Sequence, residues 1–275
     1  GAATVSSTTA STGVGTGALQ VAGGGYFGAA SVFAGGLSST GAGTNSERFG
    51  SGATSAGNYS VSVGNGATCA GAQSVVVGRA ASETGGGSNV VVGDASTATS
   101  GSAVSIGASA TAYTGCVVVG AGASAAGIQS VAIGQGASTG FNYSIVMGLS
   151  AASTAANQLV IGSSGAAITT AYIGGGVVSA TPVGLSINAT GGSGSNTVGS
   201  TLTIAAGKGT GTGVGGSLIF QTPTVGVSGS TLQTLTTALT IDTSQKATFA
   251  SSVIITGSLT TSSTTLSGAG AIPIT

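Results

Sequence analysis

The chain of 275 residues has very little charge, no histidine and no tryptophan. Charged residues make up 3% of the sequence and cancel to a net charge of zero, whereas ordinary soluble domains carry about 25%. Nucleic-acid binding needs clustered Lys and Arg that displace counterions from phosphates. The chain's basic residues are Arg48, Arg79, Lys208 and Lys246, which lie far apart. We therefore expect no nucleic-acid partner.

The same scarcity argues against an enzyme. General acid–base chemistry and most metal centres use imidazole or carboxylate groups. The only carboxylate side chains are those of Glu47, Glu83, Asp94 and Asp242. Residues 136–140 match the GxSxG pattern, but no histidine is present to activate Ser138, so we interpret the motif as a turn. Residues 211–216 match GxGxxG, but a strand is expected to follow instead of a helix, which again predicts a turn. We predict no catalytic, cofactor-binding or metal-binding residues.

Long apolar runs are also missing, although the mean hydropathy is +0.54. Every window of about 18 residues contains repeated Gly, Ser or Thr, so no membrane insertion is expected. The residues from Gly1 onward show neither a basic region nor an apolar core typical of a signal peptide. Cys69 and Cys116 are far apart, and we favour two buried small side chains over a disulfide.

Repetition dominates what is present. A short apolar segment followed by glycine recurs every 13 to 15 residues, and its glycines are Gly64, Gly78, Gly93, Gly107, Gly120, Gly134, Gly148 and Gly162. Two weaker copies end at Gly35 and Gly50. A unit this short cannot bury a face alone, so successive coils must stack as a parallel β-solenoid. We expect the glycines to align along one edge, where each coil turns sharply, and we expect no helix anywhere.

The pattern within each unit predicts which side chains point inward. Residues one and three before the glycine are large and apolar, as on one face of a short strand. We expect inward side chains at Val61, Val63, Val75, Val77, Val90, Val92, Val117 and Val119. The opposite inner wall is expected to hold Ala67, Ala81 and Ala123.

The residue two before the glycine is then expected to point outward. It is apolar at Val76, Val91, Val118, Val146 and Val160. Such a stripe is unlikely to remain in water, which predicts a homo-oligomer. Thr residues show no fixed offset across coils, which disfavours an ice-binding surface. Aromatic residues near turns are expected either to contact glycans or to fill subunit contacts, and they are Tyr59, Tyr113, Phe141 and Tyr143.

The repeats resemble a known family. Residues 74–78, which read Ser-Val-Val-Val-Gly and are followed by Ala81, are similar to the head repeats of trimeric autotransporter adhesins, as are residues 130–137. The resemblance covers roughly residues 31–165. It implies a left-handed parallel β-roll assembled as a homotrimer.

The 14-residue spacing stops after Gly165, and Thr-rich segments separated by glycine follow. Antiparallel or intertwined β structure is expected. The expected strands are residues 185–187, 202–204, 218–220, 239–241, 248–249 and 253–255. Residues 201–222 and 238–250 are similar to tail-fibre and appendage proteins of tailed bacteriophages.

Together these observations predict an all-β, homotrimeric chain with three parts. Residues 1–30 form an irregular or β segment, residues 31–165 a β-roll of 14-residue repeats, and residues 166–275 a Thr- and Gly-rich β shaft. The predicted function is a non-enzymatic attachment fibre of a phage virion, and the alternative is a bacterial trimeric adhesin or self-assembling extracellular filament. Expected partners are copies of the chain itself and a host-surface receptor or glycan, at a virion surface or outside the cell.

Overall fold

The computed structural model describes residues 42–173 and 178–257, and these form strands and turns without any helix. The all-β prediction is therefore confirmed. No helix in this part of the chain has the length and apolar character needed to cross a membrane. The chain divides between Tyr172 and Ile173 into two compact units. We describe each unit by itself.

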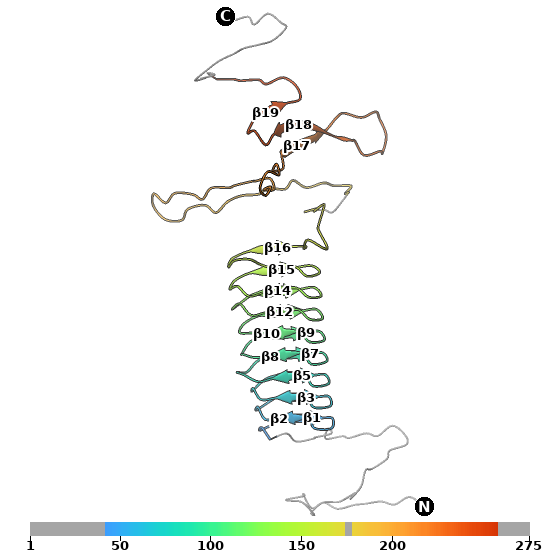
Figure 1. Cartoon of the computed structure of the whole chain (residues 1–275), viewed down its shortest axis with the longest axis vertical. Coiled ribbons are helices and arrows are strands. Elements are labelled where there is room, and N and C mark those ends of the chain that lie inside the picture. The colour runs from blue at the N-terminus through green and yellow to red at the C-terminus, as the bar shows by residue number, and fades with distance from the viewer. Residues whose placement is uncertain (1–41, 174–177, 258–275) are drawn as a thin grey trace, which may run out of the picture. The chain divides into compact units, whose positions relative to one another are not determined.

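The first unit is a parallel β-solenoid, as predicted. Each coil from β1 to β14 contributes one long and one short strand, the last two coils contribute a long strand alone, and strands of successive coils pair in parallel (Figure 1). The long strands form a nine-stranded sheet of β1 (Glu47–Phe49), β3 (Val61–Val63), β5 (Val75–Val77), β7 (Val90–Val92), β9 (Val104–Ile106), β11 (Val117–Val119), β13 (Val131–Ile133), β15 (Ile145–Met147) and β16 (Leu159–Ile161).

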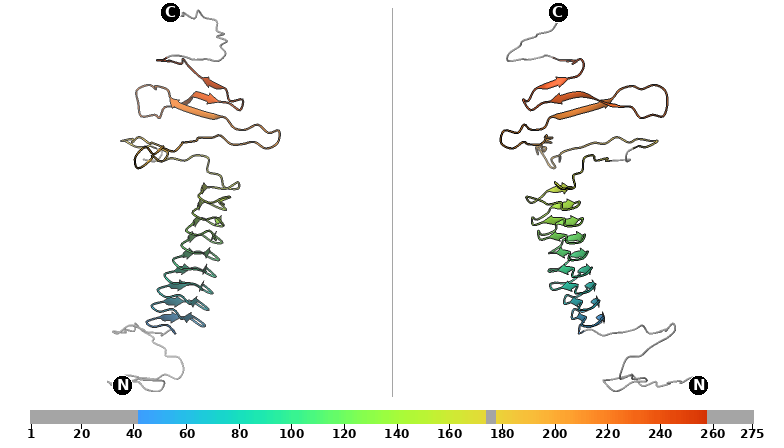
Figure 2. Two further views of the ribbon diagram at one scale, coloured as in Figure 1. Left: turned by 90° about the vertical axis from the view of Figure 1, so that its left-hand side faces the viewer. Right: turned by 45° about the vertical axis from the view of Figure 1, so that its right-hand side comes forward.

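The short strands form a second, seven-stranded sheet. It contains β2 (Thr54–Ser55), β4 (Thr68–Cys69), β6 (Ser82–Glu83), β8 (Thr97–Ala98), β10 (Thr111–Ala112), β12 (Ser124–Ala125) and β14 (Ser138–Thr139). Figure 2 shows the stacked coils of the solenoid from two other sides. Ser138 begins β14 and does not lie in the turn expected for the GxSxG match. The weak repeat ending at Gly35 and the segment 1–30 lie outside the described residues.

The repeated glycines align from coil to coil, as predicted. Gly120 has φ +148°, and a Cβ placed there would overlap the carbonyl oxygen of Gly134 in the next coil. Gly64 stands in the same relation to Gly78. Only glycine combines this backbone conformation with such a close approach. The spacing of 13 to 15 residues therefore reflects one glycine turn per coil.

The core lies between the two sheets and is lined by small side chains. Ala67, Ala81 and Ala123 are fully buried, which confirms the predicted inner wall. Cys69 and Cys116 are buried free thiols, also as expected. The middle residues of the long strands complete the core, and its fully buried valines are Val76, Val91, Val118 and Val146.

The predicted orientation of the long strands is wrong. The stripe expected outside, Val76, Val91, Val118 and Val146, lies inside with no exposed surface, and Val160 packs against the same core. The valines expected inside are partly exposed and point outward: Val61, Val63, Val75, Val77, Val90, Val92, Val117 and Val119.

The physical reason is the narrow space between the two sheets. Middle positions hold nothing larger than valine from β3 to β15, and several are Ser or Ala, such as Ser62 and Ala132. Flanking positions include Ile133, Ile145 and Met147. These larger side chains would overfill a core between sheets this close together, so the strand turns its smaller residue inward.

The second unit contains an antiparallel three-stranded sheet of β17 (Leu218–Pro223), β18 (Leu235–Ile241) and β19 (Ala247–Phe249), with a bulge between Phe220 and Gln221. The predicted strands at 218–220, 239–241 and 248–249 are confirmed. Those at 185–187, 202–204 and 253–255 are wrong, because these segments find no pairing strand among the described residues. Their apolar side chains are exposed, with Ile187 at 63% and Ile254 at 86%.

Candidate interaction surfaces

One side of the solenoid is an apolar sheet surface, which we call the valine face. It consists of the first and third side chains of each long strand from β3 to β16. Strand register aligns them in two columns, since Val75 pairs with Val90 and Val77 with Val92. In β5 and β15 these side chains are 36–42% exposed, and Leu159 reaches 64%. A continuous apolar surface of this kind marks an interaction site.

The homo-oligomer prediction depends on an exposed apolar surface. The valine face is such a surface, although different residues form it from those the sequence analysis named. The sequence predicted one outward column, whereas the structure has two, and both include larger side chains than valine. More apolar surface therefore needs cover than the sequence analysis assumed.

The opposite sheet presents a column of hydroxyl groups. The first residue of every short strand is Thr or Ser, and the column runs Thr54, Thr68, Ser82, Thr97, Thr111, Ser124 and Ser138. Thr occupies four of these seven positions and Ser the other three, so the regular column appears only when Thr and Ser are counted together. The column is polar and uncharged, so this face can remain in contact with water and does not require a partner.

The edge formed by the glycine turns carries the solenoid's ion pair. Arg79 and Asp94 lie in successive coils with Nη2 and Oδ2 2.5 Å apart. Their side chains are 68% and 47% exposed, so the pair contributes little to stability. Both residues therefore belong to a solvated surface.

Glu83, by contrast, is fully buried. Its carboxylate accepts hydrogen bonds from the Gly71 N–H, the Gly85 N–H at 3.1 Å and the Asn89 Nδ2 at 2.9 Å. These donors compensate for lost hydration, which a buried carboxylate otherwise cannot tolerate. The coil that holds Glu83 and Asn89 is one residue longer than most, and its additional residue lies in the turn between them. Through these hydrogen bonds, Glu83 stabilises the longer turn of this one irregular coil.

No protein-family model and no curated protein matches the chain. Among solved structures, the crystal structure of the collagen-binding domain of the Yersinia adhesin YadA is similar to the chain, with 28% sequence identity and a TM-score of 0.37. The match covers 48% of this chain and 82% of that domain.

Cys69 lies next to Glu83 in the paired strand of the neighbouring coil. Burial raises the pKa of the Cys69 thiol above its usual value, and the Glu83 carboxylate raises it further, while a contact with Ser60 opposes both effects. The folded chain thus holds this thiol protonated at pH values where the unfolded chain begins to ionise. Its contribution to stability is present below the unfolded pKa and is lost as pH rises through the folded one.

We expect Cys69 to resist alkylation in the native protein. Thiolate is the reactive form, and the side chain is both protonated and inaccessible. Iodoacetamide at about pH 8 should leave Cys69 unmodified in buffer and modify it fully in denaturant, as read by mass spectrometry of peptides. Cys69→Ser supplies the control for peptide assignment. Rapid native labelling would contradict the burial described here.

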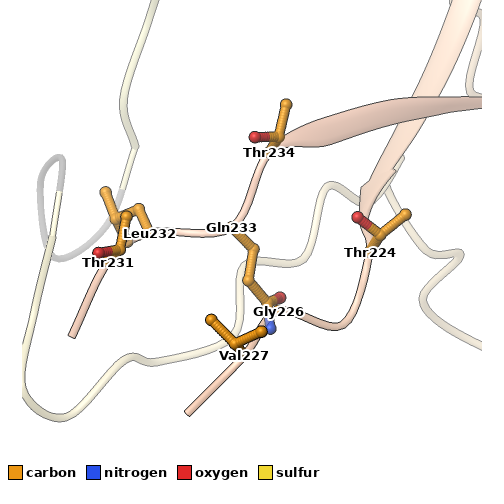
Figure 3. A pocket seen from close by; sticks show the side chains of 7 residues that line it. All are labelled: Thr224, Gly226, Val227, Thr231, Leu232, Gln233 and Thr234. Atoms are coloured by element: carbon orange, nitrogen blue, oxygen red, sulfur yellow. The ribbon is translucent and has the colours of Figure 1, made fainter. Parts of the chain in front are cut away.

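The second unit contains a shallow pocket at the loop between β17 and β18. It has a volume of about 220 Å³ and is lined by Thr224, Gly226, Val227, Thr231, Leu232, Gln233 and Thr234 (Figure 3). The Gln233 amide spans the loop when its nitrogen donates to the Thr224 carbonyl and its oxygen accepts from the Gly226 N–H, each at 3.2 Å. The amide thus supports the loop, and the pocket brings no titratable groups together.

The sequence predicted no metal, cofactor or catalytic residue. In residues 42–173 and 178–257, no three His, Cys, Asp or Glu side chains gather where they could hold a metal ion. The GxGxxG match at residues 211–216 includes a turn, in which the Gly213 N–H donates to the Thr210 carbonyl at 2.9 Å, and β17 follows it.

Proposed function

We propose that the chain is part of a homotrimeric, non-enzymatic attachment protein displayed outside the cell, of the bacterial trimeric adhesin kind. The valine face carries this proposal, because it is the feature of the solenoid that most needs a partner. The repeat that resembles adhesin heads is also the repeat that forms the coils.

Copies of the same chain are the partners that fit the valine face. Covering the exposed part of each of its side chains contributes about 1 kcal/mol, and the face repeats that gain in every coil. Three parallel chains about one axis would each turn this face inward. The hydroxyl column and both edges would then face solvent. Because the protein has little charge to keep it soluble, an uncovered apolar surface would favour association.

The expected result of a mass measurement is a trimer. Native mass spectrometry or light scattering of the unboiled protein should give three times the chain mass of 25.0 kDa. A monomer would overturn the proposal. A dimer would keep the valine face as the interface and remove the threefold axis.

The stacked coils hold their turns exposed at the edges of the solenoid, where they can contact a cell surface. We expect the trimer to bind to host cells, and labelled trimer applied to candidate cells is the test. The resemblance of residues 201–222 and 238–250 to phage fibres supports a second candidate, a virion fibre. Electron microscopy with an antibody against the solenoid separates the two, since label on cell surfaces favours the adhesin and label on particles favours the phage.

A further inference from the structure

The edge opposite the glycine turns, which we call the second edge, contains the turns that lead from each short strand to the next long strand. Each of these turns holds a residue in the left-handed backbone conformation with φ between 53° and 67°, and the longer turn that contains Ser88 also holds Gly86 at φ 70°. This column consists of Asn45, Tyr59, Gln73, Ser88, Ser102, Gly115, Gln129, Tyr143 and Asn157. Glycine and asparagine accept this conformation readily, and larger side chains do so at a cost.

Tyr59 and Tyr143 are the residues of this column whose bulky side chains are least suited to the left-handed conformation. Both have φ 56°, and their side chains are 62% and 56% exposed. A bulky residue in this conformation is strained, and little burial compensates either one. Strain that packing does not explain occurs at sites where the side chain serves a function.

Other exposed aromatic and apolar residues gather around Tyr143. Its N–H donates to the Ile128 carbonyl at 3.0 Å, which places the two in adjacent turns of the second edge. Tyr113 lies one turn further, since its N–H donates to the Ala125 carbonyl at 3.1 Å. With Phe141, these side chains are 39–56% exposed. Three successive turns thus present one apolar surface, with aromatic residues in the first and third turns and Ile128 between them, and we call it the aromatic surface.

The chemistry of this surface is uncharged and rich in amides. Its turns, residues 112–116, 126–130 and 140–144, contain no Lys, Arg, Asp or Glu. Gln129 and Asn142 are exposed beside the rings. The Asn142 Oδ1 accepts from the Ile128 N–H at 2.9 Å, which fixes its side chain over the neighbouring turn. The ion pair of Arg79 and Asp94 lies at the glycine turns, on the other edge.

We propose that the aromatic surface around Tyr143 binds an uncharged glycan, a partner class that rests on the proposed attachment function. Aromatic faces stack on the C–H faces of sugar rings, and amides bond their hydroxyls. An anionic glycan would need cations that these turns lack. A second copy of the chain is better matched by the valine face, where side chains are apolar without interruption.

The test uses the full chain and a change that the backbone favours. Tyr143→Gly combined with Phe141→Ala removes the rings, and Tyr143→Gly alone places glycine where φ is 56°. Binding to immobilised dextran, mannan and galactan is measured beside heparin, together with thermal unfolding and native mass. Gln73→Gly, in the same column but in a turn without aromatics, is the matched control.

We expect the unchanged protein to bind at least one of the three neutral polysaccharides and not heparin. The double variant should bind at least tenfold more weakly, Tyr143→Gly should unfold at an equal or higher temperature, and Gln73→Gly should bind normally. The proposal is overturned if the unchanged protein binds none of the three polysaccharides, or if the double variant binds as tightly as the unchanged protein. Loss of the oligomer in Tyr143→Gly also overturns it and assigns the ring to a subunit contact. If glycan binding fails while the trimer still attaches to cells, the proposed function stands without this inference.

Discussion

Val118→Asp is expected to prevent the solenoid from folding. Val118 has no exposed surface and lies within the apolar core cluster. A carboxylate there would lack the three N–H donors that surround Glu83. An unpaired charge in such a site costs more than about 4 kcal/mol. Far-UV circular dichroism should show loss of the strand signal.

Val119→Asp, at the neighbouring position, supplies the matched control and should give the opposite result. Val119 is 37% exposed on the valine face, so the new carboxylate can remain hydrated in the single chain. The coils should fold with a normal dichroism spectrum, and the trimer should dissociate because its assembly would bury like charges about one axis. Normal folding of Val118→Asp would contradict the inward assignment, and a trimeric Val119→Asp would exclude the valine face as the interface.

Gly120→Ala is expected to destabilise the protein far more than Gly122→Ala. Both glycines have positive φ, +148° and +65°. A Cβ at Gly120 would overlap the Gly134 carbonyl, whereas a Cβ at Gly122 meets nothing within 4 Å. We expect a loss of about 3 kcal/mol or more at Gly120, from overlap and strain together. Strain alone predicts about 1 kcal/mol at Gly122.

Denaturant unfolding of the two alanine variants measures this difference at equal protein concentration. The two changes are identical in chemistry and lie two residues apart, so the difference isolates the contact between coils. Equal destabilisation would mean that the glycine turns do not stack as closely as described.

The sequence predicted the solenoid because its strongest signal is a spacing. Glycines such as Gly64 and Gly78, and the alanine three residues later such as Ala81, recur at nearly equal intervals. A parallel stack of coils brings residues at equal intervals to equivalent positions in successive coils. Which side chains of each long strand face the core was not predictable in the same way. A segment such as Val75-Val76-Val77 is apolar on both sides, so alternation has two equally good phases. The deciding signal was size, because Ser62 and Ala132 occupy middle positions while Met147 flanks one.

The interaction surfaces were predictable only in part. The aromatic residues near turns were visible in the sequence, whereas the left-handed conformation of Tyr59 and Tyr143 depends on how each turn stacks on the next. The hydroxyl column was missed because Ser and Thr were not treated as equivalent. The burial of Glu83 depends on donors from Gly71 and Asn89, which the fold brings together from adjacent coils.

The pairing of each coil with only its immediate neighbours has a consequence for length. A whole repeat, such as residues 121–134, can be removed or duplicated while the strands on either side still find equivalent partners. Each such change alters the height of the stack by one strand spacing of about 4.8 Å. The length of the solenoid is therefore adjustable in equal steps, because gain or loss of a single repeat changes the distance between its two ends by one strand spacing.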